Sequence, residues 1–156
     1  MNDRAPLFRP GPDVAKVRDL LDRLALEVAD LRRLAAVEPA DLVSDSDRLK
    51  AVKYSFVVAI EVAVDVAHHL ISTLRLRAPR SYADAFAVLG EAGLLDDALV
   101  DRLAPMAGFR NLLVHGCARV DDSRLVTILQ TRVSDLERFS VAVAVATLAE
   151  PDQQAQ

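Results

Sequence analysis

Residues 52–71 read VKYSFVVAIEVAVDVAHHLI, and only Lys53, Glu61 and Asp65 carry charge in this stretch. A helix with this sequence is apolar on nearly every face, so protein must cover it on most sides. The stretch therefore predicts a long helix, ending near Leu74, at the centre of a helical bundle. We expect the apolar run 56–70 to be too short and too charged to span a bilayer, which indicates a soluble protein.

The segments on both sides of this stretch also show helical periodicity. Upstream, apolar residues recur every three or four positions from 17 to 34; Asp13 is a candidate N-cap, and Pro39 is expected to end the helix. Residues 41–47 are expected to be a loop and a cap. Downstream we expect a short helix capped by Ser81 and followed by Gly93, then two longer helices. These downstream helices are predicted over residues 82–92, 96–115 and 126–148.

Two features of these segments predict irregular backbone. Pro105 and Gly108 suggest a kink or a short break inside the helix 96–115. Residues 1–12 hold three prolines and are expected to be irregular, while the polar tail from residue 150 is expected to fray.

Composition supports an all-α protein. The chain has 156 residues, which suits one domain spanning 1–156. It is 52% hydrophobic but only 4% aromatic, with no Trp and five Gly. Ala, Leu and Val interleaved with charged residues suit closely packed helices better than a β-sandwich. We predict an antiparallel bundle of four main helices and a shorter fifth.

Charge and cysteine content restrict the classes of function. The net charge of −4 excludes the broad basic surface of a general nucleic-acid binder, so any RNA contact must be local. Cys117 is the only cysteine, which excludes an internal disulfide and a cysteine-based zinc site. A single cysteine fits a reducing cytosol.

Arg110 and His115 are the residues most suited to chemistry. A guanidinium matches phosphate oxygens and an imidazole exchanges a proton near neutral pH, so together they can cleave a phosphodiester without a metal. Five positions on a helix correspond to about 140° of rotation, so the two do not share a face. They meet if the helix bends, if its last turn unwinds at Gly116, or if a second subunit completes the site. Alternatively, Arg110 is solvated or salt-bridged and His115 only stabilises the helix C-terminus.

A polar stripe crosses the central apolar helix. Glu61, Asp65 and His69 are spaced i, i+4, i+8 and lie along one side. Two carboxylates at this spacing repel unless a positive group lies between them. That group is a metal ion or an arginine from another helix, for which Arg110 is suited. The remaining alternatives are a structural hydrogen-bond network and a stripe that faces water.

Two groups of arginines are candidates for contact with RNA or with a partner protein. Arg75, Arg77 and Arg80 form a basic loop before the short helix, and Arg119 and Arg124 follow His115. Each group suits phosphate or the acidic face of a partner. Such loops are also commonly just solvated.

Residues 106–115 read MAGFRNLLVH and are followed by Val120-Asp121. This string closely resembles the signature of the HepT-like toxins in the HEPN superfamily, and the resemblance covers roughly residues 48–139. It implies a helical-bundle homodimer whose metal-independent ribonuclease site lies at the dimer interface. No cofactor is implied, and the RNA is the substrate.

The resemblance also implies roles for individual residues. The family motif is Arg-x4-His-x-Tyr, which Arg110 and His115 match. His115 would act as general base or acid on the ribose 2′-hydroxyl, leaving a 2′,3′-cyclic phosphate, and Arg110 would stabilise charge on phosphorus. Asn111 would orient one of the two, since its amide both donates and accepts.

Cys117 departs from this motif, because it occupies the tyrosine position. In the family, a minimal nucleotidyltransferase antitoxin attaches AMP to that tyrosine. Three alternatives fit this substitution: a natural variant controlled only by binding, a variant modified at Tyr82 or Tyr54, and a weakened or engineered toxin. We expect a cytoplasmic toxin of a toxin–antitoxin pair. The rivals are an inactive helical module that binds a nucleotidyltransferase, and a metal-dependent hydrolase that uses the carboxylate and histidine stripe.

Overall fold

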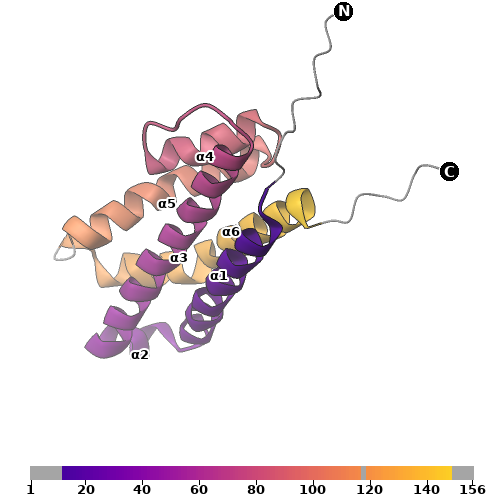
Figure 1. Ribbon diagram of the computed structural model, residues 1–156. Helices are drawn as coiled ribbons and strands as arrows, with labels where there is room; N and C mark the ends of the chain where they lie inside the picture. The colour runs from indigo at the N-terminus through magenta and orange to yellow at the C-terminus, as the bar shows by residue number, and fades with distance from the viewer. Residues whose placement is uncertain (1–11, 117–118, 149–156) are drawn as a thin grey trace, which may run out of the picture.

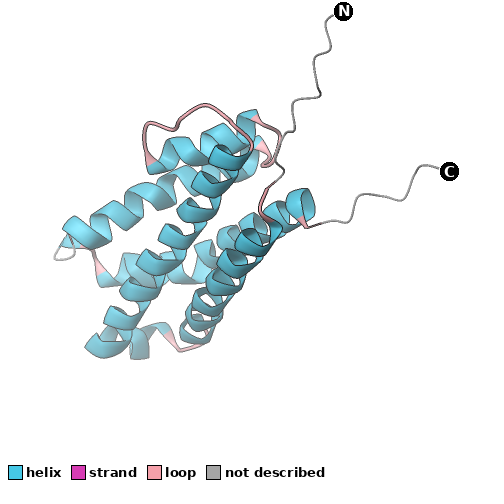
Figure 2. Cartoon of the chain, viewed as in Figure 1, coloured by secondary structure: helices cyan, strands magenta, loops and turns pink. Residues whose placement is uncertain are grey.

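The computed structural model describes residues 12–116 and 119–148, in which helices are joined by turns and loops and no strand occurs (Figure 2). This confirms the all-α prediction. These described ranges contain six helices, which are α1 Val14–Ala35, α2 Pro39–Ser44, α3 Ser46–Thr73, α4 Tyr82–Glu91, α5 Asp97–His115 and α6 Asp122–Thr147. The predicted irregular N-terminus and frayed tail fall almost entirely outside the described residues.

The bundle is arranged around α3. Figure 1 shows α3 running diagonally across the molecule, with α1 on one side, α4 and α5 on the other, and α6 passing behind it. The pairs α1 with α6 and α4 with α5 also pack against each other. The prediction that the helix containing residues 52–71 lies at the centre is therefore confirmed.

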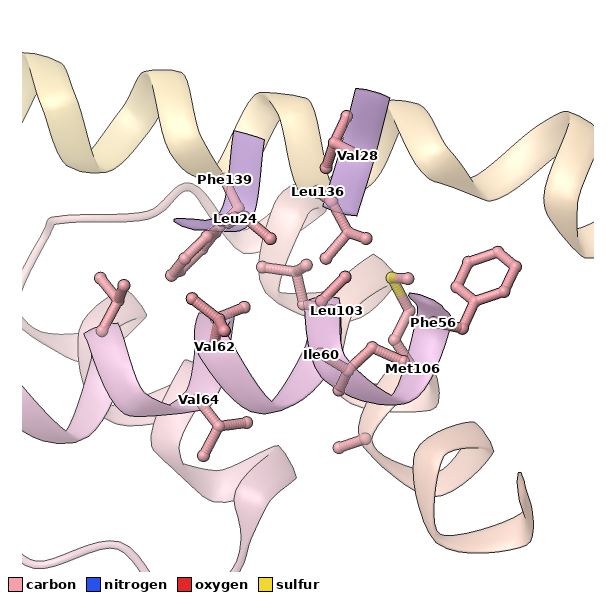
Figure 3. Packing of buried hydrophobic residues seen from close by; sticks show 14 of the residues in the cluster. Leu24, Val28, Phe56, Ile60, Val62, Val64, Leu103, Met106, Leu136 and Phe139 are labelled. Carbon is pink, nitrogen blue, oxygen red and sulfur yellow. The ribbon is translucent and has the colours of Figure 1, made fainter. Parts of the chain in front are cut away.

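The core forms where these helices meet α3. Leu24 of α1 and Phe139 of α6 lie toward the buried side chains of α3, and Leu103 of α5 approaches the same region (Figure 3). Phe139 also contacts Phe86 of α4 edge to face, with ring centroids 5.7 Å apart. One continuous cluster of buried side chains thus joins both halves of the bundle.

Length and composition alone would allow α3 to cross a membrane, contrary to our expectation for the apolar run 56–70. The helix has 28 residues, and an 18-residue window in it has a mean hydropathy of 1.5. More than half of that window, 56%, is buried inside the bundle. The apolarity of α3 is thus explained by the five helices that pack on it.

The predicted caps are confirmed at three helix ends, and Asp96 caps a fourth. Asp13 accepts a hydrogen bond from the Lys16 amide at 3.1 Å, and Asp96 accepts one from the Leu99 amide at 2.7 Å. Ser81 caps α4 in the same way. Gly93 follows α4 with a φ of 78°, a left-handed conformation that glycine adopts without strain.

The structure corrects three predicted boundaries. Pro39 does not end the first helix; it begins α2, which occupies part of the predicted loop 41–47 and buries Leu42. The predicted break at Pro105 and Gly108 does not occur, since α5 continues through both residues to His115 with apolar side chains buried on one face. Finally, α6 begins at residue 122 rather than 126, because Asp121 is its N-cap.

Candidate active site

Arg110 is the best-anchored polar side chain near the C-terminus of α5. Its Nε donates a hydrogen bond to Oε1 of Glu61 on α3 at 3.1 Å, and its Nη2 donates to the same oxygen. The Arg110 side chain is only 16% exposed, whereas that of Glu61 is 40% exposed. The ion pair therefore holds the guanidinium at a partly buried position while leaving the carboxylate in contact with solvent.

Two further residues fix the plane of this guanidinium. Nη1 of Arg110 donates to Oδ1 of Asn111 at 3.2 Å. The ring of Tyr82, the first residue of α4, lies under the guanidinium, with Cζ of Arg110 5.3 Å from the ring centroid. His68 of α3 contacts the same ring edge to face. Arg110 is thus held by α3, α4 and its own helix together.

His115 lies apart from this cluster. It is the last residue of α5 and is exposed, and the amide of Gly116 still donates to the Leu112 carbonyl oxygen at 2.8 Å. The last turn is therefore helical, and the rotation of about 140° between Arg110 and His115 is kept. Within one chain, no hydrogen bond joins these two residues in the described structure.

Of the predicted polar stripe on α3, Glu61 is the residue that reaches Arg110. Asp65 is exposed and forms no salt bridge with a described residue. His69 is half-buried, and its Nε2 is buried without a hydrogen-bond partner among the described residues. Over residues 12–116 and 119–148, no three side chains of the metal-ligating types gather closely enough to hold an ion.

The basic loop has a structural role through Arg77. The Arg77 guanidinium forms paired hydrogen bonds with Asp84, both at 2.8 Å, and with Glu91 at 2.7 and 2.9 Å. These bonds lower the pKa of both carboxyl groups from their ordinary values, most strongly that of Asp84. The backbone amide of Arg80 also donates to Asp84 at 2.7 Å. Arg77 and Arg80 therefore fasten the loop to α4. All three arginines are exposed, and Arg75 has a left-handed backbone conformation.

Arg119 and Arg124 are in a different environment, because both line a groove between α5 and α6. The sequence reasoning did not predict this groove, and it treated Tyr82 only as a modification position. Neither feature has a local signal, since the residues involved lie on separate helices. Cys117 falls outside the described residues.

The protein is thus a helical bundle that presents an anchored arginine and an exposed histidine on one helix. Its sequence shows to which family of such proteins it belongs. The family profile described as Ribonuclease HepT-like matches residues 24–143. The chain belongs to this family, which confirms the resemblance drawn from residues 106–115.

Curated relatives share part of the chain. The mRNA nuclease HepT of Shewanella oneidensis is 32% identical over 79 residues, covering 51% of this chain and 59% of the relative. The tRNA nuclease HepT of Aphanizomenon flos-aquae is 26% identical over 97 residues, covering 61% of this chain and 65% of the relative. The matched part of this chain thus spans less than two thirds of either relative.

Solved structures share the fold. The tri-AMPylated Shewanella oneidensis HEPN toxin in complex with MNT antitoxin aligns with a TM-score of 0.78 at 21% identity, over 85% of this chain and 98% of that one. The cytosolic protein YutE from Bacillus subtilis aligns with a TM-score of 0.74 at 18% identity, over 86% and 90% of the two chains.

Proposed function

We propose that this protein is the toxin of a toxin–antitoxin pair and a metal-independent endoribonuclease whose site contains Arg110 and His115. The observation that supports this most is the guanidinium of Arg110, which Glu61 and Tyr82 hold in place. The relatives of this chain also include an mRNA nuclease and a tRNA nuclease. A partly buried, preorientated cation is suited to bind a phosphate and to stabilise the charge that develops on it.

In the proposed reaction, His115 accepts the proton of a ribose 2′-hydroxyl. The 2′-oxygen forms a bond to the adjacent phosphorus, and the bond from phosphorus to the 5′-oxygen breaks. The leaving 5′-oxygen takes the proton back from the imidazolium, so the products are a 2′,3′-cyclic phosphate and a 5′-hydroxyl. Arg110 donates to the non-bridging oxygens throughout, and Asn111 keeps the guanidinium in plane.

The proposed site is completed by a second copy of the chain. Because Arg110 and His115 lie on different sides of α5, one copy alone does not place both on a single phosphate. Leu112 and Val114, on the last turn of α5 beside His115, are both exposed apolar residues. Their exposure supports an interface at this end of α5, with the two motifs brought together across a symmetry axis.

The proposed partner is a minimal nucleotidyltransferase antitoxin, acting on a single-domain toxin of residues 1–156 in the cytoplasm. With Cys117 in the tyrosine position, we propose that binding alone neutralises this toxin, or that AMP is added elsewhere. Tyr54 is well exposed and accessible to a transferase. Tyr82 is half-buried under Arg110, so AMP there would displace the guanidinium.

The rival function is an inactive module that binds the nucleotidyltransferase. Cys117 and the separation of Arg110 from His115 within one chain favour it. Purified protein incubated with RNA, with and without EDTA, distinguishes the functions. Cleavage that survives EDTA and is strongly reduced in Arg110→Ala and His115→Ala supports the proposal. Arg138→Ala, at an exposed arginine on α6, is the control. A dimer that cuts no RNA supports the inactive module, and cleavage abolished by EDTA supports a metal-dependent hydrolase using Glu61, Asp65 and His69.

A further inference from the structure

A groove of about 480 Å³ lies between the second half of α5 and the first half of α6. Its walls are largely apolar and include Phe109 and Leu112 of α5 and Ile128 of α6. The ring of Phe109 is held edge to face against Phe56 of α3, with ring centroids 5.5 Å apart. The groove therefore offers a fixed aromatic side chain in an apolar wall, which is the kind of surface on which a nucleobase packs.

Positive charge surrounds this apolar surface. Arg119, Arg124 and Arg132 line the groove, against a single acidic residue, Asp121. The carboxylate of Asp121 is already used, since it accepts a hydrogen bond from the Ser123 amide at 2.9 Å to cap α6. This local excess of arginine stands out in a chain whose net charge is −4.

The arginines differ in how firmly they are held. Arg132 has its Nε 2.9 Å from the buried carboxylate of Asp135, and its Nη2 donates to the Arg102 carbonyl oxygen at 2.8 Å. Arg119 and Arg124 are exposed and form no salt bridge with any residue in the described ranges. Two guanidinium groups are thus available for an anion at the edge of the groove.

The groove also lies on the same side of α5 as His115. Gly108, which lines the groove, and His115 are seven residues apart, so they are separated by about 20° around the helix and about 10 Å along it. Arg110 points to the opposite side, toward α3 and α4. A chain of nucleotides that entered the groove would therefore leave it beside the imidazole.

From these observations we infer that the groove binds one nucleotide of the RNA substrate next to the scissile linkage. Its base packs on Phe109 and its phosphate binds Arg119 and Arg124. This inference rests on the proposed ribonuclease function. A concave apolar surface with an aromatic wall and a cationic edge matches the flat base and anionic phosphate of single-stranded RNA, whereas the acidic surface of a protein partner would not need the apolar pocket.

The test measures binding separately from cleavage. Full-length protein carrying His115→Ala is the parent, and its affinity for a short fluorescein-labelled single-stranded oligoribonucleotide is measured by fluorescence anisotropy at several salt concentrations. Adding Arg119→Gln and Arg124→Gln together should weaken binding by on the order of tenfold, because charged hydrogen bonds to phosphate are lost. The slope of log Kd against log salt should fall by about 0.7 for each lost phosphate contact.

A second variant tests the pocket without changing any charge. A Cβ at Gly108, which lines the groove, would meet nothing within 4 Å, so this position has room for a side chain and Gly108→Leu should occupy part of the groove. It should weaken binding on the order of tenfold, like the loss of a base-stacking contact, with an unchanged salt slope. Ala98→Leu and Arg138→Gln make matched changes at exposed positions outside the groove and should leave the Kd at the parent value.

Three results would overturn the inference. If the groove variants bind RNA as tightly as the parent, the groove does not bind the RNA. The ribonuclease function would still hold in that case if the wild-type protein cleaves RNA. Groove variants that keep RNA affinity but no longer co-purify with the nucleotidyltransferase show a protein interface instead. Wild-type protein that neither binds nor cleaves RNA refutes both proposals. Weaker binding by both groove variants, with both controls unchanged, supports the inference.

Discussion

Replacing Glu61 with glutamine should slow RNA cleavage by acting through Arg110. Glu61 accepts two hydrogen bonds from the Arg110 guanidinium through one carboxylate oxygen, while Asn111 and Tyr82 hold the same group from other sides. Glutamine keeps the size and one acceptor oxygen but removes the negative charge. The guanidinium should therefore stay near its place with less restriction on its orientation.

The magnitude follows from these contacts. Losing a preorganised donor altogether, as in Arg110→Ala, should lower kcat by about a hundred- to a thousandfold. A neutral hydrogen bond has a net value of about 1 kcal/mol, and a charge-assisted one is roughly twice as strong. Glu61→Gln should therefore raise the activation free energy of cleavage by about 1 kcal/mol, which lowers the rate roughly fivefold. Since the Glu61 side chain is 40% exposed, the pair contributes at most about 1 kcal/mol to stability, and both variants should stay folded.

The assay is single-turnover cleavage of a labelled RNA by Glu61→Gln, Arg110→Ala and the double variant. Glu61→Gln should have no further effect once Arg110 is absent. An equal loss in both backgrounds would refute the reasoning, because Glu61 would then act in the chemistry itself. Asp65→Asn is the matched control, one turn along the same helix face and without a salt bridge to any described residue, and it should cleave at the wild-type rate.

Three other predictions concern stability and metal dependence. Phe139→Ala should lower the free energy of unfolding by about 3–5 kcal/mol, because loss of its fully buried ring would leave a cavity. Val141→Ala, at a 63% exposed position, should change this free energy by less than about 0.5 kcal/mol. Equal urea midpoints for the two variants would contradict this prediction. Arg77 keeps the pKa of Asp84 and Glu91 low, so these ion-paired carboxylates should stabilise the fold above about pH 4 and lose that contribution as the pH falls further. Urea unfolding in acid should therefore be less pH-dependent in Arg77→Gln, and an unchanged pH profile would count against the pairing. RNA cleavage should proceed at the same rate after dialysis against EDTA, and a rate restored only by added divalent cations would contradict the metal-free chemistry.

Much of the helical framework was predictable because its determinants are local. Asp13 and Asp96 accept hydrogen bonds from amides three residues ahead, and Gly93 adopts a left-handed conformation after α4. Residues that begin or end a helix in this way can be recognised in short windows of sequence. Two of the boundaries that were wrong depend on distant packing. Pro39 begins a short helix whose Leu42 is buried, and α5 continues past Pro105 because neighbouring helices hold its apolar face.

The sequence by itself determined that this protein is all-helical, that residues 52–71 lie at its centre, and that Arg110 and His115 belong to a ribonuclease-like motif. Periodicity and a specific string of residues carry that information without any knowledge of distances. Only the tertiary structure decided that Glu61, 49 residues away, holds Arg110, that Tyr82 lies under it, and that Arg77 is bound to α4 while Arg119 and Arg124 line a groove. The physical reason is that a charged side chain pairs with whichever group the packing of apolar faces brings within a few ångströms, and that packing joins residues far apart in the chain.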